Sequence, residues 1–339
     1  MIRSREPPVY PEVFRWLSQL WVAHTLKGKM RVTLPRSKAV PPPASLREAL
    51  RARPPVCDVR FHTRCRSLTG LPYQMAGFDS YERVSVLISF HDGLDYFLKS
   101  DQRLQQPIRR TVAYKSAVKD VFESCGIPHP EVDLILVNQQ AVELLFQIEK
   151  DCLIDVYPFS PQRVSLHLQS RGIRSFVADG HLGKLVRDLR LLGIDVAYRN
   201  DADDRDLLSI MQREQRALLT RDRPLLMHRV VKNGFFPRSQ KPFAQTIETL
   251  RRFELASALA PFTRCLRCNG ILNRTEKKAV IDQLEPLTRL YYEDFTKCPS
   301  CGQTYWRGSH IAKLEKRVEN IVATIAAGAE GTSSIPTGT

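Results

Sequence analysis

The sequence predicts a mixed protein, an α+β part followed by a parallel α/β part that ends in a small metal-binding ribbon. Three observations indicate this. Residues 82–160 have a strand–strand–helix–strand order, residues 174–223 alternate apolar runs with helical patterns, and two Cys-x-x-Cys pairs follow residue 264. Alternating strands and helices are typical of a parallel sheet, and the first order is typical of a β-grasp sheet wrapped on one helix. At 339 residues the chain is long enough for two or three domains with their own cores.

The segment 174–223 has the order strand, helix, strand, helix, strand. Four leucines recur at spacings of three and four and therefore share one helical face: Leu182, Leu185, Leu189 and Leu192. Gly193 is placed to end that helix, because glycine enters the left-handed region without strain. The remaining pattern predicts strands over 175–178, 194–198 and 217–220, with a second helix over 205–215.

Four acidic residues stand at the ends of these strands. Asp179 follows the first strand, Asp222 follows the third, and Asp203 and Asp204 open the helix between them. Ligands of open parallel sheets bind outside the carboxyl ends of the strands, so these side chains are expected on one rim. Converging carboxylates repel one another unless a cation lies between them, and all-oxygen ligation suits Mg²⁺ or Mn²⁺. The chemistry that this predicts is metal-assisted phosphodiester hydrolysis.

Helix capping is the simpler interpretation of each acid taken alone. Asp204 heads a helix, and Asp222 precedes Pro224, which is a good first-turn residue. Three acids at corresponding strand ends nevertheless favour a shared metal site.

The strings FVADGHLGKLVRDLRLLGIDV, DADDRDLL and ALLTRDRPL together resemble the Mut-seven C-terminal family of PIN-like ribonuclease domains. The resemblance extends from about Arg174 to the end of the C-terminal helix. It implies a PIN-like parallel α/β nuclease fold and cleavage of single-stranded RNA with Mg²⁺ or Mn²⁺. It places Asp179, Asp204 and Asp222 at the family's acidic positions, with Asp203 as a substitute for Asp204.

Residues 82–160 have the pattern of a compact ubiquitin-like domain. The expected elements are strands over 84–90, 110–114, 132–137, 142–146 and 152–157, and a helix over 116–125. The string SAVKDVFESCGIPHPEVDLILVNQQAV is similar to the ubiquitin-like domain that is often fused in front of this nuclease family and is related to sulfur carriers. The domain runs on from Tyr157 into Pro161 without a terminal Gly-Gly, so carrier chemistry is not expected. Docking of a protein partner and a packing role remain alternatives.

Two Cys-x-x-Cys pairs, Cys265 with Cys268 and Cys298 with Cys301, predict a structural zinc site. Each pair places two thiolates on one tight turn, and two such turns complete a tetrahedral Cys₄ set. The separating segment 269–297 exceeds the usual ~15–20 residues, which predicts an insertion with a helix over 277–284. Redox dithiols are the alternative, disfavoured by the two matching pairs. The string CGQTYWRGSH also resembles the ribbon of the family.

Positive charge and aromatic residues indicate an RNA partner. The chain has a formal charge of +15, and between residues 174 and 320 we count 27 Lys+Arg against 18 Asp+Glu. A basic surface attracts a polyanion. Arg221 and Arg223 flank the acidic rim, and Trp306 and Arg307 can stack on exposed bases, although an aromatic pair beside a zinc knuckle is more often its core.

The sequence thus predicts six segments and a cytoplasmic protein. The segments are a basic, largely irregular extension (1–81), a β-grasp domain (82–160), a linker (161–173), a nuclease domain (174–260), a ribbon with a C-terminal helix (261–326) and a disordered tail (327–339). Apolar runs are shorter than the ~20 residues of a membrane span, and the cysteine pattern favours a reducing compartment. An organellar transit peptide is only weakly indicated.

The predicted function is metal-dependent endoribonuclease activity on single-stranded RNA. A non-catalytic RNA- or ribosome-binding module is one alternative. An adaptor that acts through its ubiquitin-like domain is the other.

Overall fold

The computed structural model describes residues 82–163, 167–308 and 311–330. The expectations for the extension 1–81 and for the tail residues 331–339 lie outside the described residues. The described residues belong to one compact unit.

A five-stranded mixed sheet forms the first part of this unit, in the order β2-β1-β7-β4-β5. Its strands are β1 (Arg83–Phe90), β2 (Ile108–Ala113), β4 (Val132–Val137), β5 (Gln140–Ala141) and β7 (Cys152–Pro158). β1 pairs with β7 in parallel and with β2 in antiparallel fashion. β1 buries every second residue, and its buried side chains share one core with α3 (Val118–Ser124). The short helix α2 (Ser100–Leu104) precedes β2. The predicted order of strands around one helix is confirmed.

The strand predicted over 142–146 is wrong. β5 and β6 (Gln147–Ile148) flank that segment, and β6 pairs with β3 (Ser116–Ala117). The backbone of 142–146 instead supplies carbonyl groups to the beginning of α3, where Val118 N–H donates to Phe146 O and Lys119 N–H donates to Leu144 O. The apolar side chains that suggested a strand therefore belong to a loop whose carbonyl groups accept hydrogen bonds from the first N–H groups of α3.

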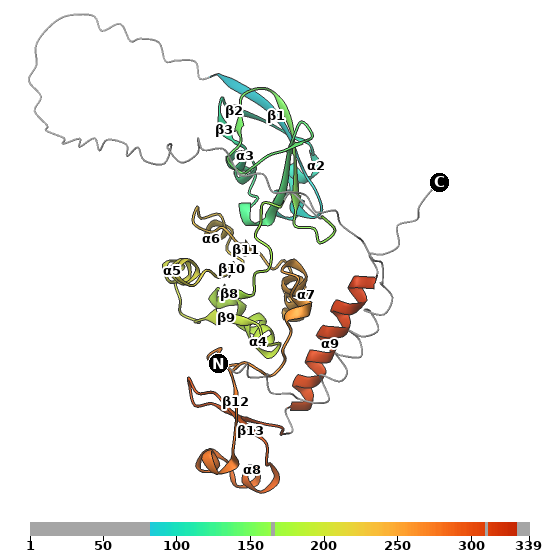
Figure 1. The fold of residues 1–339 in the computed structure, drawn as a ribbon. Coiled ribbons are helices and arrows are strands. Elements are labelled where there is room, and N and C mark those ends of the chain that lie inside the picture. The colour runs from blue at the N-terminus through green and yellow to red at the C-terminus, as the bar shows by residue number, and fades with distance from the viewer. Residues whose placement is uncertain (1–81, 164–166, 309–310, 331–339) are drawn as a thin grey trace, which may run out of the picture. The chain divides into compact units, whose positions relative to one another are not determined.

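The second part is a four-stranded parallel sheet in the order β11-β10-β8-β9 (Figure 1). Its strands are β8 (Ser175–Ala178), β9 (Asp195–Tyr198), β10 (Ala217–Leu219) and β11 (Gly234–Phe235). Phe176 and Ala178 enter one apolar core with α4 (Gly183–Leu191) and α7 (Pro242–Arg252). Val177 enters another core with α5 (Asp204–Glu214). The strands thus alternate between two covered faces, as a parallel sheet requires.

The four predicted leucines are all buried under α4, with exposed fractions of at most 1%. Gly193 has a φ of 84°, and a Cβ there would clash with the carbonyl of Ala260, so both the predicted helix end and the close approach require glycine. α6 (Arg223–Leu226) follows β10 and begins directly after Asp222.

A three-stranded antiparallel ribbon follows, formed by β12 (Asn273–Thr275), β13 (Phe295–Lys297) and β14 (Thr304–Trp306). The helix predicted over 277–284 is wrong, because that stretch consists of two short 3₁₀ turns. Val280 and Leu284 pack with Phe295 into a small cluster, and α8 (Pro286–Tyr291) begins only at Pro286. Glu285 is extended, as expected for a residue before proline.

The last helix, α9 (Ile311–Glu330), extends beyond residue 326, where the predicted ribbon segment ends. The prediction of a disordered tail is therefore wrong for residues 327–330. Val318 and Ile321 are buried in the core shared with α4 and α7. No described helix is both long and apolar enough to cross a membrane.

The two sheets are joined by buried polar contacts and a common apolar core. The Glu131 carboxylate accepts hydrogen bonds from Phe236 N–H (2.7 Å) and from the Arg238 guanidinium (3.0 Å). Glu131 is only 3% exposed, and burial raises its pKa although the charge of Arg238 opposes that effect. The β-grasp part therefore packs directly on the edge of the parallel sheet that carries β11.

Candidate active site and metal centre

The loops that follow β8, β9 and β10 line a cleft of about 1060 Å³. Asp179 follows β8, Asp204 begins α5 after β9, and Asp222 follows β10. All three predicted aspartates line this cleft. The parallel topology explains the gathering, because the carboxyl ends of parallel strands meet at one edge.

Asp179 and Asp222 are connected through one buried hydroxyl. Thr220, which is fully buried, donates from Oγ1 to Asp179 Oδ2 (2.8 Å) and accepts from Asp222 N–H (2.9 Å). Asp222 Oδ1 in turn accepts from Leu225 N–H (2.8 Å) at the beginning of α6. These bonds fix one oxygen of each carboxylate, so the orientation of both side chains is restricted.

The structure distinguishes Asp203 from Asp204. Asp203 is the N-cap of α5, and its Oδ1 accepts from Asp206 N–H at 2.8 Å. Asp204 lines the cleft, and Asp203 does not. The expected helix cap is therefore Asp203 and not Asp204. Asp222 does cap a helix, through one of its two carboxylate oxygens.

One wall of the cleft depends on two glycines that the sequence pattern did not assign to the site. Tyr198 Oη donates to the carbonyl of Gly180 (2.8 Å), which ties the loop after β8 to the end of β9. A Cβ on Gly183 would lie 2.7 Å from that hydroxyl, so a larger residue would push Tyr198 away. The Asp-Gly-x-x-Gly string was the signal that could have revealed this close approach.

The opposite wall is organised around the carbonyl of Ser239. It accepts from the Arg221 guanidinium (3.2 Å) and from Gln245 Nε2 (2.8 Å). Arg221 also donates to Gln240 Oε1 (2.7 Å) and lies 5.6 Å from the ring centre of Phe236. Both glutamines line the cleft but escaped sequence reasoning, since they belong to no motif and approach from the beginning of α7.

The cleft carries groups of both charge signs. Lys184, Arg221 and His181 line it together with the three aspartates. Among the described residues, no hydrogen-bond donor contacts the carboxylate of Asp204. The same holds for the second carboxylate oxygen of Asp179 and of Asp222. Carboxylate oxygens of this kind are the donors that Mg²⁺ and Mn²⁺ prefer, so the donor set fits a divalent cation.

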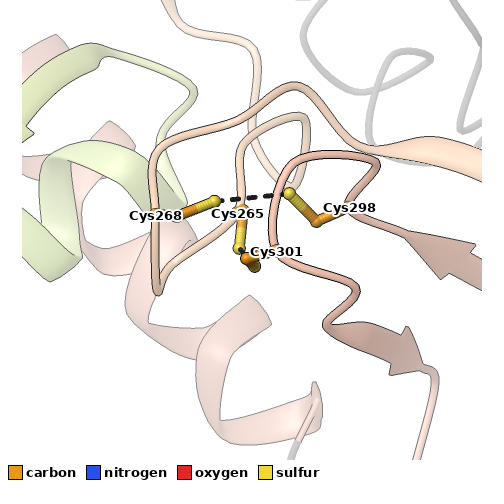
Figure 2. A group of neighbouring side chains, drawn as sticks. All are labelled: Cys265, Cys268, Cys298 and Cys301. Atoms are coloured by element: carbon orange, nitrogen blue, oxygen red, sulfur yellow. Dashed lines mark hydrogen bonds between the residues drawn. The ribbon is translucent and has the colours of Figure 1, made fainter.

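The four predicted cysteines come together in the ribbon (Figure 2). Their Sγ atoms all lie within 4.8 Å of one another, with Cys265 and Cys301 at 3.6 Å and Cys268 and Cys298 at 3.4 Å. Among the described residues this is the only His/Cys/Asp/Glu group gathered so closely, and it can hold a metal such as zinc. The aspartates of the cleft are more widely spread.

Hydrogen bonding prepares the cysteine cluster for a cation. Burial raises the pKa of the Cys265 thiol, but hydrogen bonds from the Tyr305 hydroxyl and from backbone amides outweigh it and lower that pKa to about 6. Burial and the neighbouring thiols raise the pKa of Cys268 to about 12. Four thiols at this spacing cannot all ionise unless a cation balances their charge, which is how metal binding couples to proton release.

The first cysteine turn is built into the parallel sheet. Arg190, 3% exposed, donates to the carbonyls of Val196, Leu266 and Arg267. The Asn269 side chain accepts from Val196 N–H and donates to Asp195. Hydrogen bonds therefore connect the first cysteine turn directly to β9.

The four predicted RNA-binding residues lie in different places. Only Arg221 lines the cleft. Arg223 donates to the carbonyl of Phe97 and lies over its ring, in the junction with the β-grasp part. Arg307 pairs with Glu315 of α9, and Trp306 at the end of β14 is 38% exposed.

Comparison with protein families assigns both parts of the chain. The model of the Mut7-C RNAse domain matches residues 174–318, which include the parallel sheet, the three cleft aspartates and the cysteine cluster. The model described as Mut7-C ubiquitin matches residues 83–163. The comparison with curated proteins found no match. The first match supports a nuclease role in general. The chain thus contains a Mut7-C RNAse domain over residues 174–318, preceded by a Mut7-C ubiquitin domain over residues 83–163.

Proposed function

We propose that this protein is a ribonuclease that hydrolyses single-stranded RNA internally and depends on Mg²⁺ or Mn²⁺. One observation carries the proposal. Three aspartates from three successive strand ends line a single cleft, within a segment that matches the RNAse domain. A packing role alone would not require three acids on one exposed rim.

The aspartates would hold the metal, and the surrounding residues would orient the substrate. Asp179, Asp204 and Asp222 offer carboxylate oxygens that no described protein group occupies. When bound, a divalent ion lowers the pKa of its water and stabilises charge on the attacked phosphate. The Thr220 hydroxyl holds the Asp179 carboxylate and the Asp222 backbone, and Leu225 N–H holds one oxygen of the Asp222 carboxylate.

Cations on the cleft walls would bind the phosphates of the strand. Arg221 is held by Ser239 O and Gln240 Oε1, so its guanidinium is already ordered. Lys184 supplies a second positive charge beside the acids. An ordered guanidinium loses less conformational freedom when it binds phosphate than a free one does.

The cysteine cluster would have a structural role with zinc. Four thiolates close a tetrahedral site and leave no position for substrate. Because Arg190 and Asn269 connect this site to β9, its metal would stabilise the strand that leads into the cleft. A reducing compartment such as the cytoplasm would keep the thiols available.

The test is cleavage of RNA by the full chain. We expect a labelled single-stranded RNA, and also a circular one, to be cut with Mn²⁺ or Mg²⁺ and to stay intact when neither ion is added. Asp179→Asn should lower the rate at least about 100-fold, since it removes a charged ligand. Asp201→Asn is the matched control, because Asp201 is an exposed acid near the rim that does not line the cleft.

The outcomes separate the proposal from its rivals. Binding of RNA without cleavage by the wild-type chain would indicate a non-catalytic RNA-binding module. Cleavage of linear but not circular RNA would contradict internal hydrolysis. Equal rates for wild type and Asp179→Asn would show that the acidic cleft is not the site of reaction.

A further inference from the structure

A second cavity adjoins the acidic cleft. It has a volume of about 250 Å³ and lies between β8, β9, α5 and the first cysteine turn. Val177, Leu207 and Ile210 give it an aliphatic lining, and Asn269 of the cysteine turn closes one side. Val177 and Leu207 are each 1% exposed, so this lining belongs to the folded core and not to a mobile surface.

The cavity and the cleft share a wall. Tyr198 and Ala202 line both, whereas Asn200 lines the cleft and Arg199 lines the cavity. Tyr198 is fixed in this position, because its hydroxyl donates to Gly180 O at 2.8 Å. A strand bound in the cleft beside Asp204 would therefore lie next to the cavity.

The size and chemistry of the cavity fit one flat ring system. Its volume is below the ~300–1,000 Å³ of pockets for drug-sized ligands, so it excludes a duplex or a folded element. Proteins bind single-stranded RNA by splaying out bases and stacking them on aromatic or arginine side chains. Tyr198 provides an aromatic wall, and Arg199 and Arg213 provide guanidinium groups beside aliphatic side chains.

Two exposed arginines at this cavity pair with neighbouring acids at the surface. Arg199 is 57% exposed and contacts Asp201 and Asp206 at 3.4 Å. Arg213 is 66% exposed and pairs at 2.8 Å with Glu214, which also lines the cavity. Arg190 differs, because its guanidinium donates to three backbone carbonyls. It therefore lines the cavity without being available to bind a phosphate. The exposed guanidinium groups of Arg199 and Arg213 can therefore also attract a phosphate of a bound strand.

We propose that this cavity binds one unpaired nucleobase of the RNA strand next to the phosphate held in the acidic cleft. The inference rests on the proposed ribonuclease function and adds a subsite to it. It explains a preference for single strands by structure, because a paired base cannot leave its stack to enter.

The test combines an altered ligand with an altered cavity. Binding of the full chain to a short RNA is measured by fluorescence anisotropy without added Mg²⁺ or Mn²⁺ and without a chelator, which would remove metal from the cysteine cluster beside the cavity. A single abasic nucleotide is moved along the strand. Wild type should lose about tenfold in affinity for abasic substitution at one position only, since stacking on one base supplies that much. Ile210→Phe, which fills the cavity from α5, should bind intact RNA about tenfold more weakly and be indifferent to the abasic position.

Leu208→Phe is the matched control, because Leu208 is a half-buried neighbour on α5 that lines neither cavity nor cleft. It should keep the wild-type abasic profile. Equal losses at all positions, or a position-specific loss that survives in Ile210→Phe, would overturn the base site. Cleavage that depends on Asp179 would still uphold the proposed function in that case. A position-specific loss without any cleavage would support the base site and refute the ribonuclease.

Discussion

The cysteine cluster and the acidic cleft are two ligand sets on one domain, and they are built in opposite ways. The four sulfur atoms all lie within 4.8 Å of one another, while the aspartates spread along a cleft of about 1060 Å³. Each cysteine pair sits on one tight turn whose backbone closes on itself, as in Cys265 N–H to Gly270 O and Gly302 N–H to Cys298 O. The aspartates come from three separate strand ends. A site made by local turns is compact, and a site made by topology leaves room for substrate.

The acidic cleft is itself divided into a fixed half and an adjustable half. Asp179 and Asp222 are tied through the Thr220 hydroxyl, whereas Asp204 is exposed and has no such bond among the described residues. Asp203, one residue before it, holds the helix end instead. Of the three acids, Asp204 is thus the one whose carboxylate no hydrogen bond among the described residues fixes.

The largest effect is expected from breaking the compact site. Cys298→Ala should abolish stoichiometric zinc binding and unfold the ribbon, because structural zinc sites contribute on the order of 10 kcal/mol to folding. Metal analysis and thermal unfolding by circular dichroism measure both effects. Cys152→Ala, a buried cysteine of β7 outside the cluster, should keep the zinc and cost about 1 kcal/mol. Equal zinc content in the two variants would contradict a four-cysteine site.

The next largest effect separates the two neighbouring acids. Asp204→Asn should lower the cleavage rate about 100-fold or more and leave unfolding unchanged, since it removes a charge that faces the cleft. Asp203→Ala should do the reverse, with normal cleavage and a loss of about 1 kcal/mol in the free energy of unfolding from the missing cap. Steady-state kinetics and urea unfolding of both variants distinguish the roles. Loss of cleavage in Asp203→Ala alone would reverse the assignment.

A smaller effect tests the fixed half of the cleft. Thr220→Val keeps the shape of the side chain but leaves Asp222 N–H without an acceptor and Asp179 without a donor. We expect the Mn²⁺ concentration for half-maximal cleavage to rise about 10- to 100-fold, with a stability loss of about 1–3 kcal/mol. Thr220→Ser restores the hydroxyl and should recover the Mn²⁺ requirement. A Mn²⁺ titration in which valine and serine variants behave alike would argue against a positioning role.

The sequence was informative wherever a local pattern determined the structure. The leucine spacing before Gly193 predicted α4 and its buried face, and the cysteine pairs predicted the thiol cluster, because both depend on neighbours in the chain. The alternation of strands and helices predicted that the sheet is parallel. The resemblance to the nuclease family led to the same aspartates that now line one cleft.

Sequence patterns failed where distant contacts decide. β11 has only two residues, too few for a periodic signal, and it forms because β10 offers an edge. Gln240 and Gln245 reach the cleft only because α7 packs beside it. The long segment between the cysteine pairs suggested a helix over 277–284, yet Val280 and Leu284 pack on Phe295 of β13 from short turns. Whether Asp203 or Asp204 entered the site also depended on which one capped α5.

The smallest effect concerns the connection between the two ligand sets. Asp195 of β9 accepts from Arg216 and Asn269, and it also faces Arg264 beside the first cysteine turn. Burial raises the pKa of Asp195, but these partners outweigh it and hold the pKa below its usual value. A lowered folded-state pKa means that the ionised carboxylate stabilises the fold above about pH 4. That contribution is lost as the pH falls through the folded pKa.

Asp195→Asn should therefore lower the free energy of unfolding by about 1–3 kcal/mol at pH 7, and its difference from wild type should shrink as the pH falls below about 4. Urea unfolding at pH 7 and pH 3 measures both values. Asp201→Asn is the control, since Asp201 is fully exposed and pairs only with Arg199, and it should match wild type at pH 7. If the difference in free energy of unfolding between wild type and Asp195→Asn were the same at pH 7 and pH 3, the charge of Asp195 would not matter. Asp195 would then join the cysteine turn to β9 by shape and hydrogen bonding alone.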